Sequence, residues 1–186
     1  MDGRVKTLHP KLYGGILFKR NNKKHQKQIK KINIKKIDLV IVNFYPFEEA
    51  VKTGNYKKII ENIDIGGPTL VRAAAKNYED VTVITDTSQY IALQNEMNKY
   101  RGSTTLNFRK ILSRDAFLET GYYDTKITEY LNKADNDSPP PKKKLIGGNL
   151  VENLRYGENP HQGASVYSIN KEINIKQLNG KKLSYN

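Results

Sequence analysis

Residues 64–77 read DIGGPTLVRAAAKN, and this stretch decides the fold more than any other part of the chain. Pro68 suits the first turn of a helix, because the N–H that proline lacks has no helical partner at that position. Gly66 and Gly67 would let a ligand approach the exposed N–H groups of the helix start, where an anion is favoured. The stretch therefore predicts a helix that begins beside an acid, Asp64, and faces an anion.

The basic residues of this helix support the same interpretation. Arg72 and Lys76 lie four residues apart, and no acid between them offsets their repulsion on the shared helix face. A bound anion would relieve that repulsion. The ordinary alternative is an alanine-rich helix that packs through Leu70, Val71 and Ala74 while its two cations are simply solvated.

Apolar runs on both sides of this helix predict strands of a parallel sheet. Residues 37–42, IDLVIV, and 81–85, VTVIT, have the near-continuous apolar character of buried strands. Helices are expected over residues 23–32, 69–77 and 88–100, and Ser88 is the expected N-cap of the last one. A longer helix is expected after its N-cap Thr104; it is interrupted near Gly121 and resumes over residues 127–131. Alternating strands and helices predict a parallel sheet wrapped by helices.

Residues 135–144, DNDSPPPKKK, interrupt every periodicity, because they contain no apolar side chain to bury and their prolines favour extended backbone. We therefore expect a first domain over residues 1–133, a linker over 134–144 and the beginning of a second domain over 145–186. Short strands are expected in the second domain at residues 165–167 and 173–178.

The composition excludes several classes of protein. The 186 residues contain no Cys, so a disulfide framework, a thiolate metal site and a Cys nucleophile are absent, and we expect no metal and a cytoplasmic location. No apolar stretch reaches membrane-spanning length. The formal net charge is +13, and residues 19–36 hold nine Lys or Arg and no acid. This segment has no aromatic residue for base stacking, so we interpret it mainly as a solvated surface and nucleic acid as an unlikely partner.

Four further motifs occur along the chain in a fixed order. They are GRVKTLHP (3–10), VNFYPF (42–47), NLRYGENPHQ (153–162) and LNGK (178–181). Together with residues 64–77 they resemble the bifunctional purine biosynthesis family, which joins an IMP cyclohydrolase to an aminoimidazole carboxamide ribonucleotide formyltransferase. The resemblance implies an α/β domain of three layers with a methylglyoxal-synthase-like parallel sheet, followed by the start of an α+β, cytidine-deaminase-like transferase domain. It also implies that this chain lacks the usual beginning of the first domain and most of the second.

The family resemblance assigns roles to residues of the first domain. The family reaction closes the purine ring: an amide nitrogen attacks a formyl carbon and water leaves, which requires proton transfer and stabilisation of an oxyanion. By resemblance Lys76 is the proton donor and acceptor, Lys6 and Tyr45 polarise the formyl oxygen, and Asp64 orients the amide or the neighbouring lysine. Positions that hold the nucleotide in the family correspond to Arg4, Val5, Thr7, Val42, Asn43 and Ile65. Taken singly, each residue has an ordinary structural explanation, such as a helix cap or a solvated lysine.

The second domain offers half of a further site. By resemblance Arg155 and Tyr156 contact the aminoimidazole nucleotide of the formyltransferase, whose co-substrate is 10-formyltetrahydrofolate and whose sites form across a homodimer. The cyclohydrolase step needs no cofactor. His9 is expected to be structural, His25 solvated and His161 part of a turn. The alternatives are a methylglyoxal-synthase-like phosphate-binding domain and a basic nucleic-acid-binding module.

Overall fold

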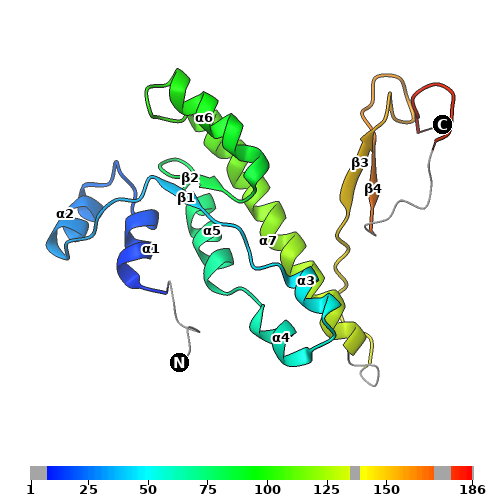
Figure 1. The fold of residues 1–186 in the computed structure, drawn as a ribbon. Helices are drawn as coiled ribbons and strands as arrows, with labels where there is room; N and C mark the ends of the chain where they lie inside the picture. Colours follow the sequence, from blue (N-terminus) through cyan, green and yellow to red (C-terminus); the bar gives the residue numbers. More distant parts are fainter. Residues whose placement is uncertain (1–7, 135–138, 170–176, 186) are drawn as a thin grey trace. The chain divides into compact units, whose positions relative to one another are not determined.

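A computed structural model of the chain describes residues 8–134, 139–169 and 177–185. The predicted site residues Arg4, Val5, Lys6 and Thr7 lie outside the described residues. The chain divides into two compact units, residues 1–127 and 128–186 (Figure 1). This division falls a few residues before the predicted linker, and the domain limits given above stay a prediction.

The first unit contains a short parallel sheet with helices around it (Figure 1). Its elements in chain order are α1 (Pro10–Leu17), α2 (Lys23–Lys31), β1 (Leu39–Ile41), α3 (Phe47–Lys52), α4 (Tyr56–Glu61), α5 (Gly66–Lys76), β2 (Thr82–Ile84), the 3-10 helix η1 (Thr87–Gln89), α6 (Tyr90–Lys99) and α7 (Leu106–Ala134), which runs past the division between the units.

Strands β1 and β2 pair in parallel, with Val40 opposite Val83. Parallel strands need a crossover connection, and α3, α4 and α5 supply it. Helix α5 packs against both strands and against α1. The centre of the core is apolar and fully buried, with Val71 and Ala74 from α5 beside Ile84 from β2. The predicted α/β architecture is therefore confirmed.

The two strands differ in burial, and the prediction of two buried strands is correct for only one of them. All three residues of β2 are buried. In β1 only Val40 is buried, whereas Leu39 and Ile41 are 37% and 46% exposed. Within the described residues each of the two strands has one strand neighbour, so the difference comes from packing: Val83 and Ile84 of β2 belong to the core cluster, whereas Val40 is the only residue of β1 in it. An apolar run does not show how completely the rest of the fold covers a strand.

Helix α2 follows the prediction, whereas the start of the helix near residue 88 does not. The Asn22 side chain caps α2 by accepting N–H bonds from Lys24 and His25. The residue that caps η1, immediately before α6, is Asp86 rather than Ser88, and it forms a reciprocal capping box with Gln89. The aspartate two residues earlier offers the stronger acceptor, which explains the shift.

Helix α7 is one continuous helix of 29 residues, so the predicted interruption near Gly121 is wrong. One interior glycine costs only about 1 kcal/mol, and buried residues on both sides, Ala116 and Tyr123, hold the helix in place. The predicted cap is also displaced by one residue. The Phe108 N–H donates to the Thr105 hydroxyl at 3.3 Å, whereas the hydroxyl of Thr104 bonds that of Thr82.

The second unit contains an antiparallel pair of strands, β3 (Asn149–Asn153) and β4 (Ser165–Ser168), with an irregularity between Leu150 and Glu152. Strand β4 confirms the strand predicted at 165–167, and β3 was not predicted. Most of the strand predicted at 173–178 falls outside the described residues, and its last two residues are not in a strand. Among the described residues of this unit only Gly157 is buried.

Candidate functional site

The carboxylate of Asp64 joins the turn after β1 to the start of α5. One of its oxygens accepts the N–H of Gly67 at 2.8 Å, and the other accepts the N–H of Tyr45 at 3.3 Å. Tyr45 follows the carboxyl end of β1, where ligands of parallel sheets collect. Two of the residues predicted to be catalytic therefore lie together, although 19 positions separate them in the sequence.

Gly67 is the position that admits this carboxylate. A Cβ at residue 67 would lie 2.5 Å from Oδ2 of Asp64, a distance that real Cβ atoms do not tolerate. This glycine was predicted to let a ligand approach the helix start. In the structure the atom close to it is an oxygen of Asp64. A carboxylate at a helix N-terminus satisfies a free N–H and is favoured by the helix dipole. The start of α5 is therefore capped by the protein itself.

A second contact fixes the first turn of α5. The Thr69 hydroxyl donates to the carbonyls of Ile65 and Gly66 at 2.9 and 3.0 Å. It also lies 2.8 Å from the Tyr13 hydroxyl. Because the single hydroxyl proton of Thr69 is committed to the helix, Tyr13 is the donor in this bond. The site is thereby tied to α1.

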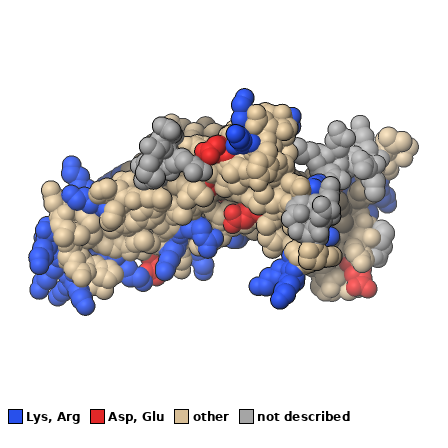
Figure 2. Space-filling view, turned by 90° about the horizontal axis from the view of Figure 1, so that it is seen from below, with Lys and Arg blue, Asp and Glu red and all other residues tan. Residues whose placement is uncertain are grey.

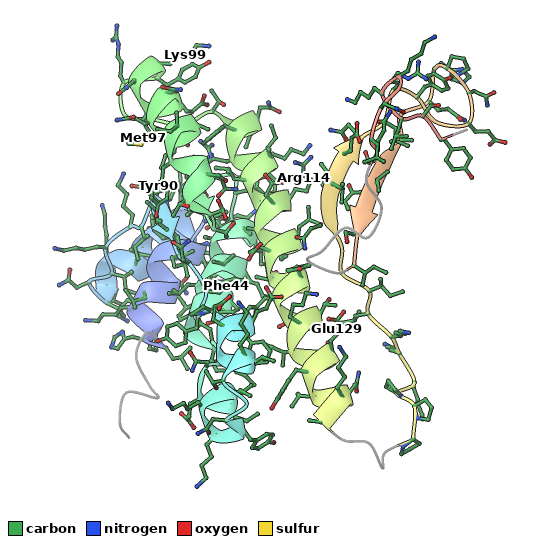
Figure 3. The ribbon with its side chains drawn as sticks, turned by 45° about the vertical axis from the view of Figure 1, so that its right-hand side comes forward. Phe44, Tyr90, Met97, Lys99, Arg114 and Glu129 are labelled. Atoms are coloured by element: carbon green, nitrogen blue, oxygen red, sulfur yellow. The ribbon has the colours of Figure 1, made fainter. Side chains whose placement is uncertain are left out.

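Tyr123 of α7 reaches the same loop and was not identified from the sequence. Its hydroxyl accepts the N–H of Asp64 at 2.8 Å and donates to the carbonyl of Asn62 at 3.2 Å. Its ring lies 5.0 Å from that of Phe44 and 6.2 Å from that of Phe47. Phe44 lies at the centre of the side-chain view, beside α7 (Figure 3). Burial raises the pKa of the Tyr123 hydroxyl, which keeps the proton that it donates.

The predicted nucleotide contacts of this region are accessible from solvent. Tyr45 is 42% and Ile65 is 59% exposed. Asn43 is exposed, and Val42, Asp64, Gly66 and Gly67 are half-buried. The turn after β1 and the start of α5 thus place the Asp64 carboxylate and the partly exposed Tyr45 at an accessible surface, while the N–H groups of Tyr45 and Gly67 are already bonded to Asp64.

Lys76 and Arg72 lie on α5 away from Asp64. Ten residues separate Gly66 from Lys76, which corresponds to about 15 Å along the helix. Lys76 is exposed and has no partner among the described residues. The guanidinium of Arg72 lies 5.4 Å from the centre of the Phe117 ring. The Lys76 ammonium is therefore available to a ligand, whereas Arg72 already has an aromatic contact.

Two of the described histidines, His9 and His25, accept backbone N–H groups. The Nδ1 of His9 accepts the N–H of Lys11 at 3.1 Å and caps α1, as a structural role predicted. His25 was expected to be solvated, but it is half-buried and its Nδ1 accepts the N–H of Lys19 at 3.1 Å. The expectation was wrong because the chain folds back before α2, which the local sequence does not reveal. His161 lies in a turn, as predicted.

Basic side chains gather at the end of the first unit that carries α2, on the left of the space-filling view (Figure 2). Three cations of this region have acidic partners: Lys19 with Glu79, and both Arg20 and Lys36 with Asp38. In the described part of the chain no group of three or more His, Asp or Glu could hold a metal ion. None of the described helices is long and apolar enough to cross a membrane.

Comparison with known proteins decides the family. The sequence model of the family described as "AICARFT/IMPCHase bienzyme" matches residues 74–186, more than half of the chain. The chain belongs to this family. A second model, described as "MGS-like domain", matches residues 1–69. The match of residues 1–69 ends and that of residues 74–186 begins inside α5, with residues 70–73 between them, so Asp64 belongs to one match and Lys76 to the other.

Relatives of this bienzyme family match along the whole chain. A protein of Bradyrhizobium diazoefficiens named bifunctional purine biosynthesis protein PurH is 46% identical over 191 residues, which cover 100% of this chain and 36% of the relative. A protein of the same name from Acetivibrio thermocellus is 45% identical over 196 residues, which cover 100% of this chain and 37% of the relative. The chain thus spans little more than a third of the length of these relatives.

A solved structure gives a comparison at the level of the fold. The structure titled "Crystal structure of ForH" superimposes with a TM-score of 0.59 and 30% sequence identity, and the match covers 70% of this chain and 68% of that one. The fold described above is therefore shared with a protein whose structure has been determined by crystallography.

The family match includes the second predicted site, at Arg155 and Tyr156. The Arg155 Nε donates to the carbonyl of Lys182 at 2.5 Å, and its guanidinium lies 5.2 Å from the centre of the Tyr156 ring. The carbonyl of Tyr156 accepts the N–H of Tyr185 at 3.2 Å. Both residues are therefore bonded to the segment 182–185, and the terminal nitrogens of Arg155 make no hydrogen bond within the described residues.

Proposed function

We propose that the first unit carries the nucleotide-facing part of an IMP cyclohydrolase site. In this reaction the carboxamide nitrogen of formamidoimidazole carboxamide ribonucleotide bonds to the formyl carbon, the formyl oxygen leaves as water, and IMP results. Membership of the bienzyme family and the names of its relatives support this proposal. The observation that carries it is the Asp64 carboxylate, which holds the Tyr45 turn and the start of α5 together.

The proposed chemistry needs an oriented nucleophile, a proton carrier and a stabiliser of negative charge. Asp64 is held by two backbone N–H groups, so its remaining lone pairs can accept a proton of the substrate amide. The backbone N–H of Tyr45 bonds Asp64, and by resemblance the Tyr45 phenol would donate to the formyl oxygen. By resemblance Lys76 would transfer the proton; its ammonium has no partner among the described residues, but it lies about 15 Å along α5 from the helix start that Asp64 caps, so its role rests on the resemblance and not on the geometry around Asp64. Lys6, Arg4, Val5 and Thr7, which lie outside the described residues, complete the proposed nucleotide contacts by resemblance.

The second unit is proposed to begin the formyltransferase, which moves a formyl group from 10-formyltetrahydrofolate to aminoimidazole carboxamide ribonucleotide. Arg155 supports this proposal, because a guanidinium with free terminal nitrogens can bind a phosphate in bidentate fashion. We further propose that the protein works in the cytoplasm and that the full enzyme is a homodimer. The substrates would be purine ribonucleotides in both reactions.

Calorimetric titration of the purified chain with IMP tests nucleotide binding. We expect a measurable heat of binding, and no heat at millimolar IMP on folded protein would overturn the proposal. Ring closure is followed by the ultraviolet absorbance of IMP. Lys76→Ala should abolish turnover while IMP binding persists, because the proposed role of Lys76 lies in the transition state. Tyr45→Phe should have a smaller effect, and unchanged turnover in Lys76→Ala would remove that residue from the mechanism.

The match of residues 1–69 to an MGS-like domain favours one alternative, a domain that binds phosphorylated ligands in general. A purine site requires the purine base of its ligand for tight binding, whereas a general phosphate site does not. If inorganic phosphate and ribose 5-phosphate compete with IMP at similar concentrations, the general phosphate site is the better description. If IMP binds at least about tenfold more tightly than ribose 5-phosphate, corresponding to about 1.4 kcal/mol, the purine site is favoured.

A further inference from the structure

We infer that Tyr123 is a positioning residue of the cyclohydrolase site, and that its hydroxyl fixes the backbone of residues 62–64 so that the Asp64 carboxylate faces the Tyr45 turn. This inference rests on the function proposed above and adds to it a residue from α7. Tyr123 does not belong to the turn after β1 or to the start of α5, and 59 positions separate it from Asp64.

The hydroxyl of Tyr123 makes bonds to two sites of the same loop. It accepts the N–H of Asp64 at 2.8 Å and donates to the carbonyl of Asn62 at 3.2 Å. A phenol can do both at once, because it has one proton and two lone pairs. The two bonds hold the peptide groups on either side of Ile63. They therefore set the direction in which the Asp64 side chain leaves the backbone.

The ring of Tyr123 contacts the other half of the site. It packs against Phe44 and Phe47, which lie on either side of Tyr45 in the sequence. Aromatic pairs at these separations and tilted angles are favourable. One buried side chain therefore holds both segments whose meeting point is the Asp64 carboxylate, and only 7% of it is exposed to solvent.

The protonation of Tyr123 is consistent with this role. Burial raises the pKa of its hydroxyl and outweighs the opposite effect of the bond from the Asp64 N–H, and the nearby carboxylates of Asp64 and Asp124 raise the pKa further. The hydroxyl therefore keeps its proton over the range in which the enzyme would work, and the bond to Asn62 persists. Positioning through a neutral donor and acceptor needs no change of charge during the reaction.

The adjacent tyrosine provides a matched control. Tyr122 is half-buried, and the ammonium of Lys126 lies 5.0 Å from the centre of its ring. Tyr123→Phe and Tyr122→Phe each remove one hydroxyl from the same turn of α7 and keep the ring. Both variants lose one hydroxyl group from α7. A difference between them therefore measures the effect of the Tyr123 hydroxyl, which bonds the loop.

Amide hydrogen exchange tests the positioning without any nucleotide. In the unsubstituted protein the Asp64 amide should exchange at least about tenfold more slowly than that of Ile65, whose N–H has no partner among the described residues. Tyr123→Phe should raise the exchange rate of the Asp64 amide by about tenfold, and Tyr122→Phe should leave it unchanged. Equal exchange at Asp64 and Ile65 in the unsubstituted protein would overturn the inference even if Tyr123→Phe did not fold.

Turnover then tests whether the position matters to the reaction. For ring closure we expect kcat of Tyr123→Phe to fall by about tenfold, the factor for one lost hydrogen bond, with KM changed by less than about twofold. Tyr122→Phe should retain its full rate. If the unsubstituted chain neither binds IMP nor forms it, the proposed function fails. If the unsubstituted chain is active and the two variants are equally active, the positioning role alone fails.

Discussion

The two compact units of the chain differ in the use that they make of apolar side chains. In the first unit, residues from α1, α5, β2, α6 and α7 form a single core, and several of them, such as Val71 and Ile84, are completely buried. In the second unit Leu150, Tyr167 and Leu178 are 52%, 62% and 88% exposed. The difference shows that the fixed geometry around Asp64 is supported by packing, whereas the Arg155 region depends on backbone hydrogen bonds.

The largest effect should come from removing core volume. Ile84→Ala deletes buried methyl groups of β2 and should lower the free energy of unfolding by about 2–5 kcal/mol. Leu150→Ala removes a half-exposed side chain of β3, and it should cost no more than about 0.5 kcal/mol. Urea unfolding followed by circular dichroism measures both. Equal losses in the two variants would mean that the units are not different in the way described above.

The next effect concerns glycine. Gly67→Ala places a methyl group where the Asp64 carboxylate lies, so the carboxylate must move and leave the N–H groups of Gly67 and Tyr45. Affinity for IMP should fall about tenfold, corresponding to about 1.4 kcal/mol. The control is Gly163→Ala in the second unit, where an added Cβ meets no atom within 4 Å. Calorimetry should show unchanged IMP affinity in this control, and a loss there would place nucleotide binding elsewhere.

A smaller effect of opposite sign is expected at Gly121. A Cβ at this position of α7 also meets no atom within 4 Å. Gly121→Ala should therefore raise the free energy of unfolding by about 0.5–1 kcal/mol, because alanine loses less backbone entropy in a helix. Thermal unfolding would show the increase. A decrease would indicate that this part of α7 is not the regular helix that replaces the predicted interruption.

The smallest predicted effect is a dependence of stability on pH. Hydrogen bonds from the hydroxyl and the N–H of Ser88 hold the pKa of the Asp86 carboxyl below its ordinary value. A carboxylate whose pKa is lowered on folding stabilises the protein above its unfolded pKa, and this contribution is lost as the pH falls through the folded pKa. Stability should therefore decline below about pH 4. Because Asp86 is exposed, we expect its contribution to be at most about 0.5 kcal/mol. Asp86→Asn should reduce the decline, which urea unfolding above and below this pH would show.

Local patterns in the sequence predicted most of the elements of the first unit. The acid-free basic stretch predicted α2, the apolar run at 81–85 predicted β2, and Pro68 with the following alanines predicted α5. Exposure of β1 could not be predicted, because an apolar run does not show how completely the rest of the fold covers a strand. The cap at Asp86 could have been predicted from the sequence, because an acceptor residue three positions before Gln89 is a capping-box pattern.

The site itself was predicted only in part. Asp64 and Tyr45 were identified from motifs, and the structure places them together. A helix cap was the ordinary alternative for Asp64, and the structure shows that contact with the Gly67 N–H, whereas the glycines alone also suit an external anion. Tyr123 could not be found from its surroundings in the sequence, since its partners are about sixty positions away. Long-range hydrogen bonds of this kind leave no periodic signal.

The most direct test of the account is a titration of the isotope-labelled chain with IMP, followed by the amide resonances in proton–nitrogen correlation spectra. We predict that the largest shifts belong to the amides of Tyr45, Asp64 and Gly67, with little change in the second unit. Shifts confined to Arg155 and Tyr156, or to the lysines of α2, would contradict the claim that the Asp64 carboxylate organises the nucleotide site.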